Sequence, residues 1–366
     1  MKAGGAPDIE IYENEIPEFV AAGLDRLYET VYCTLARFNI YGEADNASTY
    51  VARSGGNITC LILFRVEGAT VRVVNQQIAL AQEDLRGFAA AIFARYRQVR
   101  VISFYAIDAQ IDDVGFPFQK FAALEENMLA LPATAAEYIS SISPNLWKRI
   151  QAAERKLRRD HPDCRFEVLA GREVGEPTLR EVVALAGARM ASKQKDAYLA
   201  GDHVDQILRL IHAYGFVGIL RVDGVIRAGN VFYGVGQRYF MHVIAHDPGY
   251  DLYMPGHMVH YMAACYCIER GGRECCLMGG GRENKARFGA FSKYLDSVDI
   301  YRSRLQYMLA VRRVSAGTGR QLVQRAKANL LRLAKADGRA ARLAALCLEL
   351  ARSARQSWRV GASSQK

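Results

Sequence analysis

The most constraining feature of this sequence is an order of predicted elements that occurs twice. Residues 49–106 predict three strands, a helix and a strand, and residues 216–278 predict the same β-β-β-α-β order. The dipeptide Asp223-Gly224 is a strong hairpin signal between the first two strands of the second copy. Strands that alternate with a long crossover helix favour a mixed sheet, so we expect a tandem α/β (mixed α+β) fold.

The regions around the two copies are predicted to be mostly helical. Residues 9–41 hold one amphipathic helical pattern, and residues 134–159 hold a helix with basic exposed positions. Further helices are expected over 178–192 and 204–213. Residues 112–131 are expected to be a connector with short extended pieces.

Length and charge divide the chain further. Its 366 residues exceed the roughly 100–200 of one domain, so we expect a half over 1–130, a half over 131–310 and a tail over 311–366. The tail holds 13 of the 48 Lys and Arg but 2 of the 38 Asp and Glu. It is predicted to be helical, and could pack on the domain, bind an anionic membrane surface or contact nucleic acid such as tRNA. Packing is the favoured interpretation, because amphipathic helices most often pack.

The ends and the cysteines point to a cytoplasmic chain without a metal. Residues 1–18 are polar and lack the basic start and apolar run of a signal peptide, and no stretch approaches the ~20 apolar residues of a membrane span. The eight cysteines include no C-x-x-C pair. Cys265 and Cys267 are predicted on a helix, where a spacing of two points them to opposite sides. We therefore expect reduced, buried cysteines.

An ordered set of residues in the second copy points to a known family. The set comprises Asp223-Gly224, Gly229, Tyr239, the segment 250–256 that ends in Pro-Gly before a helix, and the segment 285–289, Lys-Ala-Arg-Phe-Gly. This set resembles the BioF2-like acetyltransferase domain, which is typified by proteins named after CelD and belongs to the GCN5-related N-acetyltransferase (GNAT) superfamily. The resemblance covers about 131–305, and over 9–130 it is one of pattern only. The segment 285–289 is also similar to a motif of the FemAB peptidyltransferases, which are tandem versions of the fold.

The resemblance implies three alternative functions. The first is an acyltransferase that moves an acyl group from acyl-CoA, acetyl-CoA or a related thioester to an amine or hydroxyl, in cell-envelope or polysaccharide metabolism. The second is a FemAB-like enzyme that uses aminoacyl-tRNA as the donor. The third is a non-catalytic GNAT-like binding protein. The usual donor-binding pattern of the superfamily is reduced to Pro255-Gly256 within 250–259, which keeps another donor open.

Direct attack on a thioester needs a proton acceptor near the acceptor substrate. His242 is one candidate, because histidine titrates near neutrality, and alternation along 238–245 places it on the face of His246. His246, Asp247 and Glu283 are the other candidate bases. The alternative interpretations are a hydrogen-bonded core histidine, a turn-forming aspartate and a solvated glutamate.

Donor and substrate binding need positive groups and exposed backbone N–H donors. The pyrophosphate of the donor suits the helix N-terminus formed by Pro255, Gly256 and His257. Two cationic residues follow the glycines at 279–281 and are expected to bind an anionic group. Lys285 is predicted to be part of the catalytic machinery, and Arg282 is predicted to contact the substrate. Tyr294 is a further candidate for substrate binding, with ordinary half-buried packing as its alternative.

Overall fold

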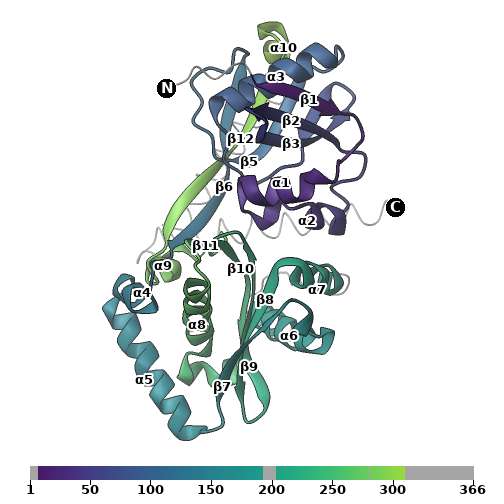
Figure 1. Cartoon of the computed structure of the whole chain (residues 1–366). Helices are drawn as coiled ribbons and strands as arrows, with labels where there is room; N and C mark the ends of the chain where they lie inside the picture. The colour runs from purple at the N-terminus through teal and green to yellow at the C-terminus, as the bar shows by residue number, and fades with distance from the viewer. Residues whose placement is uncertain (1–6, 193–202, 280, 310–366) are drawn as a thin grey trace, which may run out of the picture. The chain divides into compact units, whose positions relative to one another are not determined.

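The computed structural model describes residues 7–192, 203–279 and 281–309. The strands of this part form one 12-stranded mixed sheet with the order β1-β2-β3-β4-β5-β12-β6-β11-β10-β9-β8-β7 (Figure 1). Both predicted β-β-β-α-β copies are present in it, so the expected fold class is confirmed.

The first copy occupies the β1 end of the sheet. Its elements are β2 (Ser48–Ser54), β3 (Asn57–Glu67), β4 (Thr70–Val73), α3 (Gln82–Arg95) and β5 (Val101–Ile107). It is preceded by β1 (Asp8–Tyr12), α1 (Phe19–Tyr28), the 3-10 turn η1 (Val31–Cys33) and α2 (Leu35–Ile40). The expected single helical pattern over 9–41 is therefore wrong: its start is a strand paired with β2, and a left-handed Glu29 (φ 44°) ends α1.

The second copy occupies the β7 end. It comprises β8 (Gly215–Val222), β9 (Val225–Val235), β10 (Arg238–His246), the 3-10 turn η3 (Pro248–Tyr253), α8 (Pro255–Glu269) and β11 (Glu274–Cys276). Before it come α4 (Ala135–Ser141), α5 (Pro144–Asp160), β7 (Arg165–Ala170), the 3-10 turn η2 (Gly171–Glu173), α6 (Glu176–Ser192) and α7 (His203–Tyr214). The helix expected over 134–159 is split, because Ser143 caps α5 and Pro144 cannot continue a preceding helix.

Two long strands join the copies. They are β6 (Phe118–Ala130) and β12 (Phe291–Tyr301), which pair antiparallel with each other. On their outer edges, β12 also pairs with β5 and β6 also pairs with β11. The expected connector over 112–131 is thus mostly one strand. Its residues do not alternate between buried and exposed positions, so the sequence lacks the alternation of apolar and polar residues that predicts a strand.

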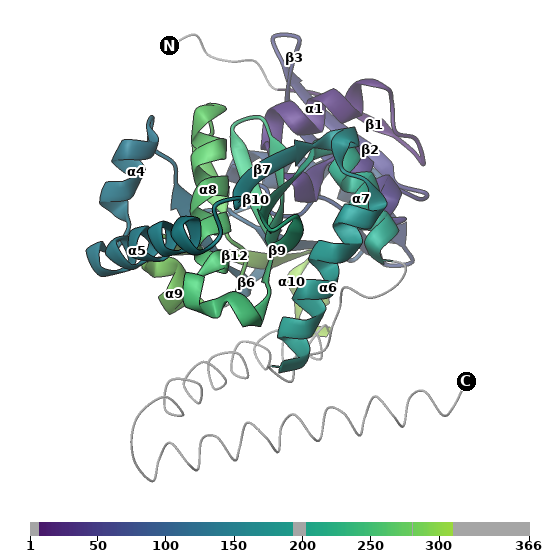
Figure 2. The ribbon, with the colours of Figure 1, turned by 90° about the horizontal axis from the view of Figure 1, so that it is seen from below.

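Helices cover both faces of the second copy (Figure 2). On one face α8 packs with α4 and α5 over a core that includes Tyr239, Met241 and Cys275. On the other face α6 and α7 cover a core that includes Phe240 and Cys276. Neighbouring residues of β10 and β11 therefore point to opposite faces, as strand geometry requires.

After Arg302 the structure describes one further helix, α10 (Arg304–Leu309). Its Leu305, Met308 and Leu309 are exposed. The helices predicted beyond residue 309 lie outside the described residues. Among the helices that are described, none combines the length and apolar character needed to cross a membrane.

Candidate functional site

The parallel strands β10 and β11 separate along their length. Within the described chain they pair only over Arg238–Phe240 and Glu274–Cys276. Beyond Phe240, β10 stays with β9, whereas the chain after β11 stays beside β6, where the N–H of Leu277 donates to the Asn127 carbonyl at 2.7 Å. A gap in the hydrogen-bonded sheet therefore opens after Phe240 and Cys276.

A β-bulge lies at the start of this gap. Met241 pairs with Phe232 and Val243 with Val231, so His242 is an extra residue on its strand. The alternation expected over 238–245 is wrong beyond this point, because Val243 and Ala245 share the α6–α7 core with Phe240. The His242 Nδ1 lies 3.2 Å from the Tyr233 hydroxyl. Burial, helped by the nearby Arg37 charge, lowers the pKa of His242 to about 4, so the ring is neutral at neutral pH.

Helix α8 begins beside the far end of β10, at the three predicted cofactor-binding residues. Its N-cap, Met254, is left-handed (φ 51°) and provides no side-chain cap. A Cβ on Gly256 would lie 2.7 Å from His246 Nδ1, so glycine is what allows the ring to approach the helix end. The opposite ring nitrogen of His246 lies 2.8 Å from an Asp251 carboxylate oxygen. An uncapped helix N-terminus suits an anionic group such as a pyrophosphate.

Asp247 has structural partners. One carboxylate oxygen accepts a hydrogen bond from Arg227 at 2.8 Å, and the other accepts the Gly249 backbone N–H at 2.9 Å. The aspartate thus caps η3 and pairs with a cation. This geometry matches the turn-forming alternative, and it occupies the carboxylate that a base would need.

Lys285 lies on α9 (Arg282–Ala286) and binds the chain that follows β11. Its ammonium donates to the carbonyls of Met278, at 2.7 Å, and Gly279, at 3.1 Å. Burial lowers its pKa. The Met278 carbonyl also accepts from the Asn127 amide at 2.8 Å, and Met278 has a positive φ of 62°. Lys285 therefore fixes a strained turn at the edge of the gap.

The rest of the 285–289 motif packs against α8 and α4. The Phe288 ring lies 4.2 Å from the His260 ring and 5.8 Å from the His257 ring. Gly289 has φ +89°, and a Cβ there would lie 3.0 Å from the Ser141 carbonyl. The motif thus contacts both the turn at Met278, through Lys285, and the first turns of α8, through Phe288.

Sequence reasoning missed His260. It lies one helical turn after His257, is 5% exposed, and its Nε2 has no hydrogen-bond partner among the described residues. Burial and the neighbouring charges of His257 and Lys285 lower its pKa to about 3. The available signal was the i, i+3 spacing of the two histidines, which places them on one face of a helix.

The remaining predicted residues lie at the surface. Arg282 and Glu283 are exposed in the first turn of α9. Tyr294 is 54% exposed on β12, with its hydroxyl 3.5 Å from a Glu125 carboxylate oxygen. The structure brings His257 and Lys285 together around His260, but it does not bring Asp247 or Tyr294 into that cluster.

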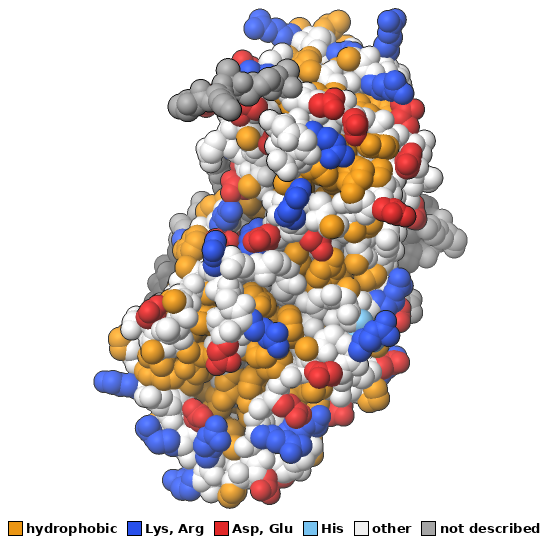
Figure 3. Space-filling view, viewed as in Figure 1, with side chains coloured by type: hydrophobic (Ala, Val, Ile, Leu, Met, Phe, Trp, Pro, Cys, Tyr) orange, Lys and Arg blue, Asp and Glu red, His pale blue; other side chains and the backbone are white. Residues whose placement is uncertain are grey.

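The surface above α8 is rich in hydrophobic side chains, which Figure 3 shows in the lower part of the view. Partly buried apolar residues that pack against the core under α8 include Trp147, Tyr261 and Tyr266. The Trp147 and Tyr261 rings lie 4.8 Å apart. In the part of the chain that is described, no group of three or more His, Cys, Asp or Glu is placed to hold a metal ion.

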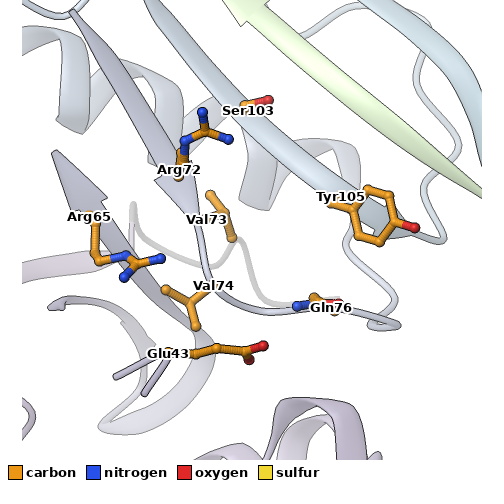
Figure 4. Close-up of a pocket in the computed structure, with 8 residues that line it drawn as sticks. All are labelled: Glu43, Arg65, Arg72, Val73, Val74, Gln76, Ser103 and Tyr105. Atoms are coloured by element: carbon orange, nitrogen blue, oxygen red, sulfur yellow. The ribbon is translucent and has the colours of Figure 1, made fainter. Parts of the chain in front are cut away.

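The first copy contains a different cavity, of about 170 Å³, beside β4 and β5 (Figure 4). Arg65, Arg72, Ser103 and Tyr105 are among its lining residues. The chains of β4 and β5 do not stay apart here, because beyond the cavity the N–H of Gln77 donates to the Ala106 carbonyl at 2.7 Å. The first copy therefore has no through-going gap like that between β10 and β11.

The fold and the gap define a GNAT-type architecture with two related halves. Residues 145–286 match the model of a family described as "Acetyltransferase (GNAT) domain", so this part of the chain is similar to GNAT-type acetyltransferase domains. No curated protein matches the sequence significantly. The more specific BioF2-like identity stays a prediction.

Solved structures are similar over most of the chain. FemX has a TM-score of 0.60 at 9% identity, over 82% of this chain and 99% of its own. L-PGS from Bacillus licheniformis has a TM-score of 0.47 at 14% identity, over 83% and 98%. A tandem GNAT protein from the clavulanic acid biosynthesis pathway has a TM-score of 0.40 at 11% identity, over 80% and 98%. The FemX likeness extends the shared fold beyond the family match to both halves.

Proposed function

We propose that this protein is an acyltransferase, which moves an acyl group from a thioester such as acyl-CoA to an amine or hydroxyl. The observation that carries the proposal is the gap between β10 and β11, with a bulge at its start and an uncapped helix beside its far end. A fully paired sheet leaves no backbone groups between its strands for a thioester, whereas β10 and β11 have no strand pairing to each other beyond Phe240 and Cys276.

The residues around the gap fit the needs of the donor. The first turn of α8 would bind the pyrophosphate through the Gly256 backbone N–H, because Pro255 has no N–H and the His257 N–H donates to the Met254 carbonyl at 3.0 Å. The bulged His242 lies outside the regular ladder, so its backbone N–H is positioned to polarise a thioester carbonyl. Lys285 holds the opposite edge of the gap in place through two carbonyls.

Of the predicted bases, His242 lies on the bulge at the start of the gap. A neutral imidazole accepts a proton, although a pKa of about 4 makes it a weak base. Direct attack by the acceptor needs no covalent enzyme intermediate. Arg282 and Glu283 remain candidates for contacts with an incoming substrate at the surface. An acceptor from cell-envelope or polysaccharide metabolism follows from the BioF2-like and CelD-like resemblance alone.

A ligand screen tests the proposal. Thermal unfolding should be measured with acetyl-CoA and longer acyl-CoAs, because a ligand at 100 times its Kd stabilises by about 2.7 kcal/mol. Thiol release would then be followed with amine and hydroxyl acceptors. Stabilisation by an acyl-CoA and acceptor-dependent thiol release are expected. If no acyl-CoA stabilises the protein or releases thiol, the thioester proposal is wrong and a non-catalytic binding role becomes the better one.

A second candidate is an aminoacyl-tRNA-dependent transferase. It is favoured by the similarity of fold to FemX and by the 13 Lys and Arg within 311–366. The same segment would also suit an anionic membrane surface. The full chain should then bind tRNA with an affinity that falls steeply with salt, and a variant with Arg332, Lys335 and Arg339 changed to Gln should bind more weakly. Binding that is insensitive to salt and to these changes would exclude this candidate.

A further inference from the structure

A second cavity, of about 190 Å³, lies where the two copies meet. Its lining residues come from the loop after β4, the end of β5, and strands β6, β10, β11 and β12. It is on the face of the sheet opposite α8, because the Cys276 thiol hydrogen-bonds the Glu126 carboxyl in its wall, and Cys276 belongs to the α6–α7 core.

Most charges in this cavity are already paired. The Lys293 ammonium lies 2.9 Å from an Asp108 carboxylate oxygen, and the Arg238 guanidinium lies 3.1 Å from a Glu274 carboxylate oxygen. Each cation therefore has its own carboxylate. The fifth charged group, the Glu126 carboxyl, has no cation of its own within ion-pair distance among the described residues.

Two oxygen acceptors in the wall lack partners. Glu126 is 4% exposed, and neither its Oε1 nor the Oε1 of Gln77 has a hydrogen-bond partner in the described part of the chain. Buried polar atoms are nearly always hydrogen-bonded, and leaving one unpaired costs about 1–3 kcal/mol. Two unpaired acceptors, one of which belongs to the unpaired Glu126 carboxyl, call for a ligand that donates at least two hydrogen bonds and carries positive charge.

We propose that this cavity binds a protonated primary amine, held by Glu126 and Gln77, and that this amine is the acyl acceptor. A primary ammonium has three N–H donors and one positive charge, which matches the two acceptor oxygens and the carboxyl. Binding of the amine follows from the cavity itself, whereas its role as acceptor rests on the proposed acyltransferase function.

The cavity lies beside the gap. Cys276, whose thiol hydrogen-bonds Glu126, is the last residue of β11 and pairs with Phe240, where the two strands part. The donor helix α8 covers the other face, where Cys275 lies. In the proposed arrangement the donor therefore approaches from the α8 face and the amine from the Glu126 face, so the two do not compete for the same space.

This arrangement gives a balanced transfer step. The ammonium passes one proton to the Glu126 carboxylate, whose pKa is raised by burial against the opposing charges of Arg238 and Lys293. The free amine forms a C–N bond to the acyl carbon and the C–S bond breaks. The departing thiolate takes up the second proton that nitrogen loses, which leaves an amide and a thiol.

Binding of the amine can be measured without any acyl donor. Saturation-transfer NMR on the full-length protein would use 1-pentylamine as the probe and 1-pentanol as its neutral match. We expect a saturable signal for the amine and a much weaker one for the alcohol. Equal signals for the two probes, or none for the amine, would overturn the proposal.

Three variants locate the site. Glu126→Gln keeps the size but removes the charge, and should weaken binding of 1-pentylamine at least 10-fold. Glu125→Gln is the matched control, because Glu125 is the exposed neighbour on the same strand and points to the opposite face; its binding should be unchanged. Gln77→Glu adds a carboxylate to the wall and should tighten binding several-fold, an outcome that misfolding cannot mimic. Unchanged affinity in both Glu126→Gln and Gln77→Glu places the amine elsewhere.

Failure of this proposal is distinct from failure of the proposed function. Suppose that acyl-CoA stabilises the protein, that thiol is released only when a hydroxyl acceptor is present, and that 1-pentylamine does not bind. This outcome would reject the amine cavity and keep the acyltransferase function. Binding of 1-pentylamine that depends on Glu126, without any effect of acyl-CoA, would keep the cavity and reject the thioester donor.

Discussion

The two β-β-β-α-β copies differ in what happens to their parallel strand pair. In the first copy, β4 and β5 pair over Thr70–Arg72, and the chains then rejoin through the Gln77–Ala106 and Ile78–Asp108 backbone hydrogen bonds, at 2.7 and 2.8 Å. In the second copy, β10 and β11 part after three pairs. One topology thus produces a closed sheet in one half and an open gap in the other.

The distribution of side chains follows the same division. All seven histidines of the sequence lie at or after position 161, and four of them, from His242 to His260, lie in β10 and α8 around the gap. The first copy instead contributes a cavity lined by Arg65 and Arg72, and half of the wall of the proposed amine site. A duplicated fold therefore does not imply two open strand pairs, and under the proposed function only the second copy would take the donor.

The largest effect is expected from Lys285→Ala. The change frees the Met278 and Gly279 carbonyls and lets the gap edge move, and a misplacement of about 1 Å costs about 100-fold in turnover. The measurement is steady-state thiol release with the fold checked by circular dichroism. Lys120→Ala is the matched control in the first half, because its ammonium also donates to a backbone carbonyl, that of Ala109 at 2.8 Å. Equal turnover in the Lys285 variant and the native protein would remove Lys285 from the site.

Asn75 lies between β4 and Gln77 and ties this segment of the first copy to β3. This residue is fully buried, and its amide accepts from the Leu63 N–H at 2.7 Å and donates to the Leu61 carbonyl at 3.1 Å. Asn75→Ala should lower the free energy of unfolding by about 2–3 kcal/mol in urea titrations. Asn230→Ala in the second copy should cost about 1 kcal/mol, because its amide makes one long bond, 3.3 Å to the Val259 carbonyl. The reverse order would contradict the comparison.

The helix end beside the gap can be perturbed by one methyl group. Gly256→Ala places a Cβ 2.7 Å from His246 Nδ1 and should displace the ring, raising the Kd for acyl-CoA about 10-fold, or 1.4 kcal/mol. Gly187→Ala in α6 is the control, because a Cβ there meets no atom within 4 Å. Isothermal titration calorimetry would measure both. Equal Kd values for the two variants would show that the donor does not use this end of α8.

The smallest expected effect concerns acid stability. Burial lowers the folded-state pKa of His260 to about 3 from 6.5, so below pH 6.5 the unfolded chain binds a proton that the folded one does not. Stability from this group is complete above pH 6.5 and declines as the pH falls toward 3. Between pH 7 and pH 5.5, His260→Leu should lose about 1 kcal/mol less than the native protein in urea unfolding, whereas His203→Leu, at an exposed position, should not differ from the native protein. If the His260 variant lost as much free energy of unfolding as the native protein, the native His260 ring would take up its proton in the folded state as well.

Local signals in the sequence gave the elements of both copies. Asp223-Gly224 and Pro255-Gly256 marked a hairpin and a helix start that the structure contains. The strands β6 and β12 could not be found in this way, because their residues do not alternate regularly between core and solvent. The bulge at His242 was equally invisible, because a single extra residue leaves composition and spacing intact while it shifts the following side chains.

What the sequence determined by itself was the repeated element order, the turn residues and the concentration of histidines in the second half, since these depend on neighbours a few residues apart. Only the tertiary structure decided which strand pair opens, that His260 is buried beside Phe288, and that Gln77 and Glu126 share one cavity wall. These features join residues that are far apart in the chain, or depend on one register shift. Pairing across a sheet is set by the packing of the whole core, which no local pattern contains.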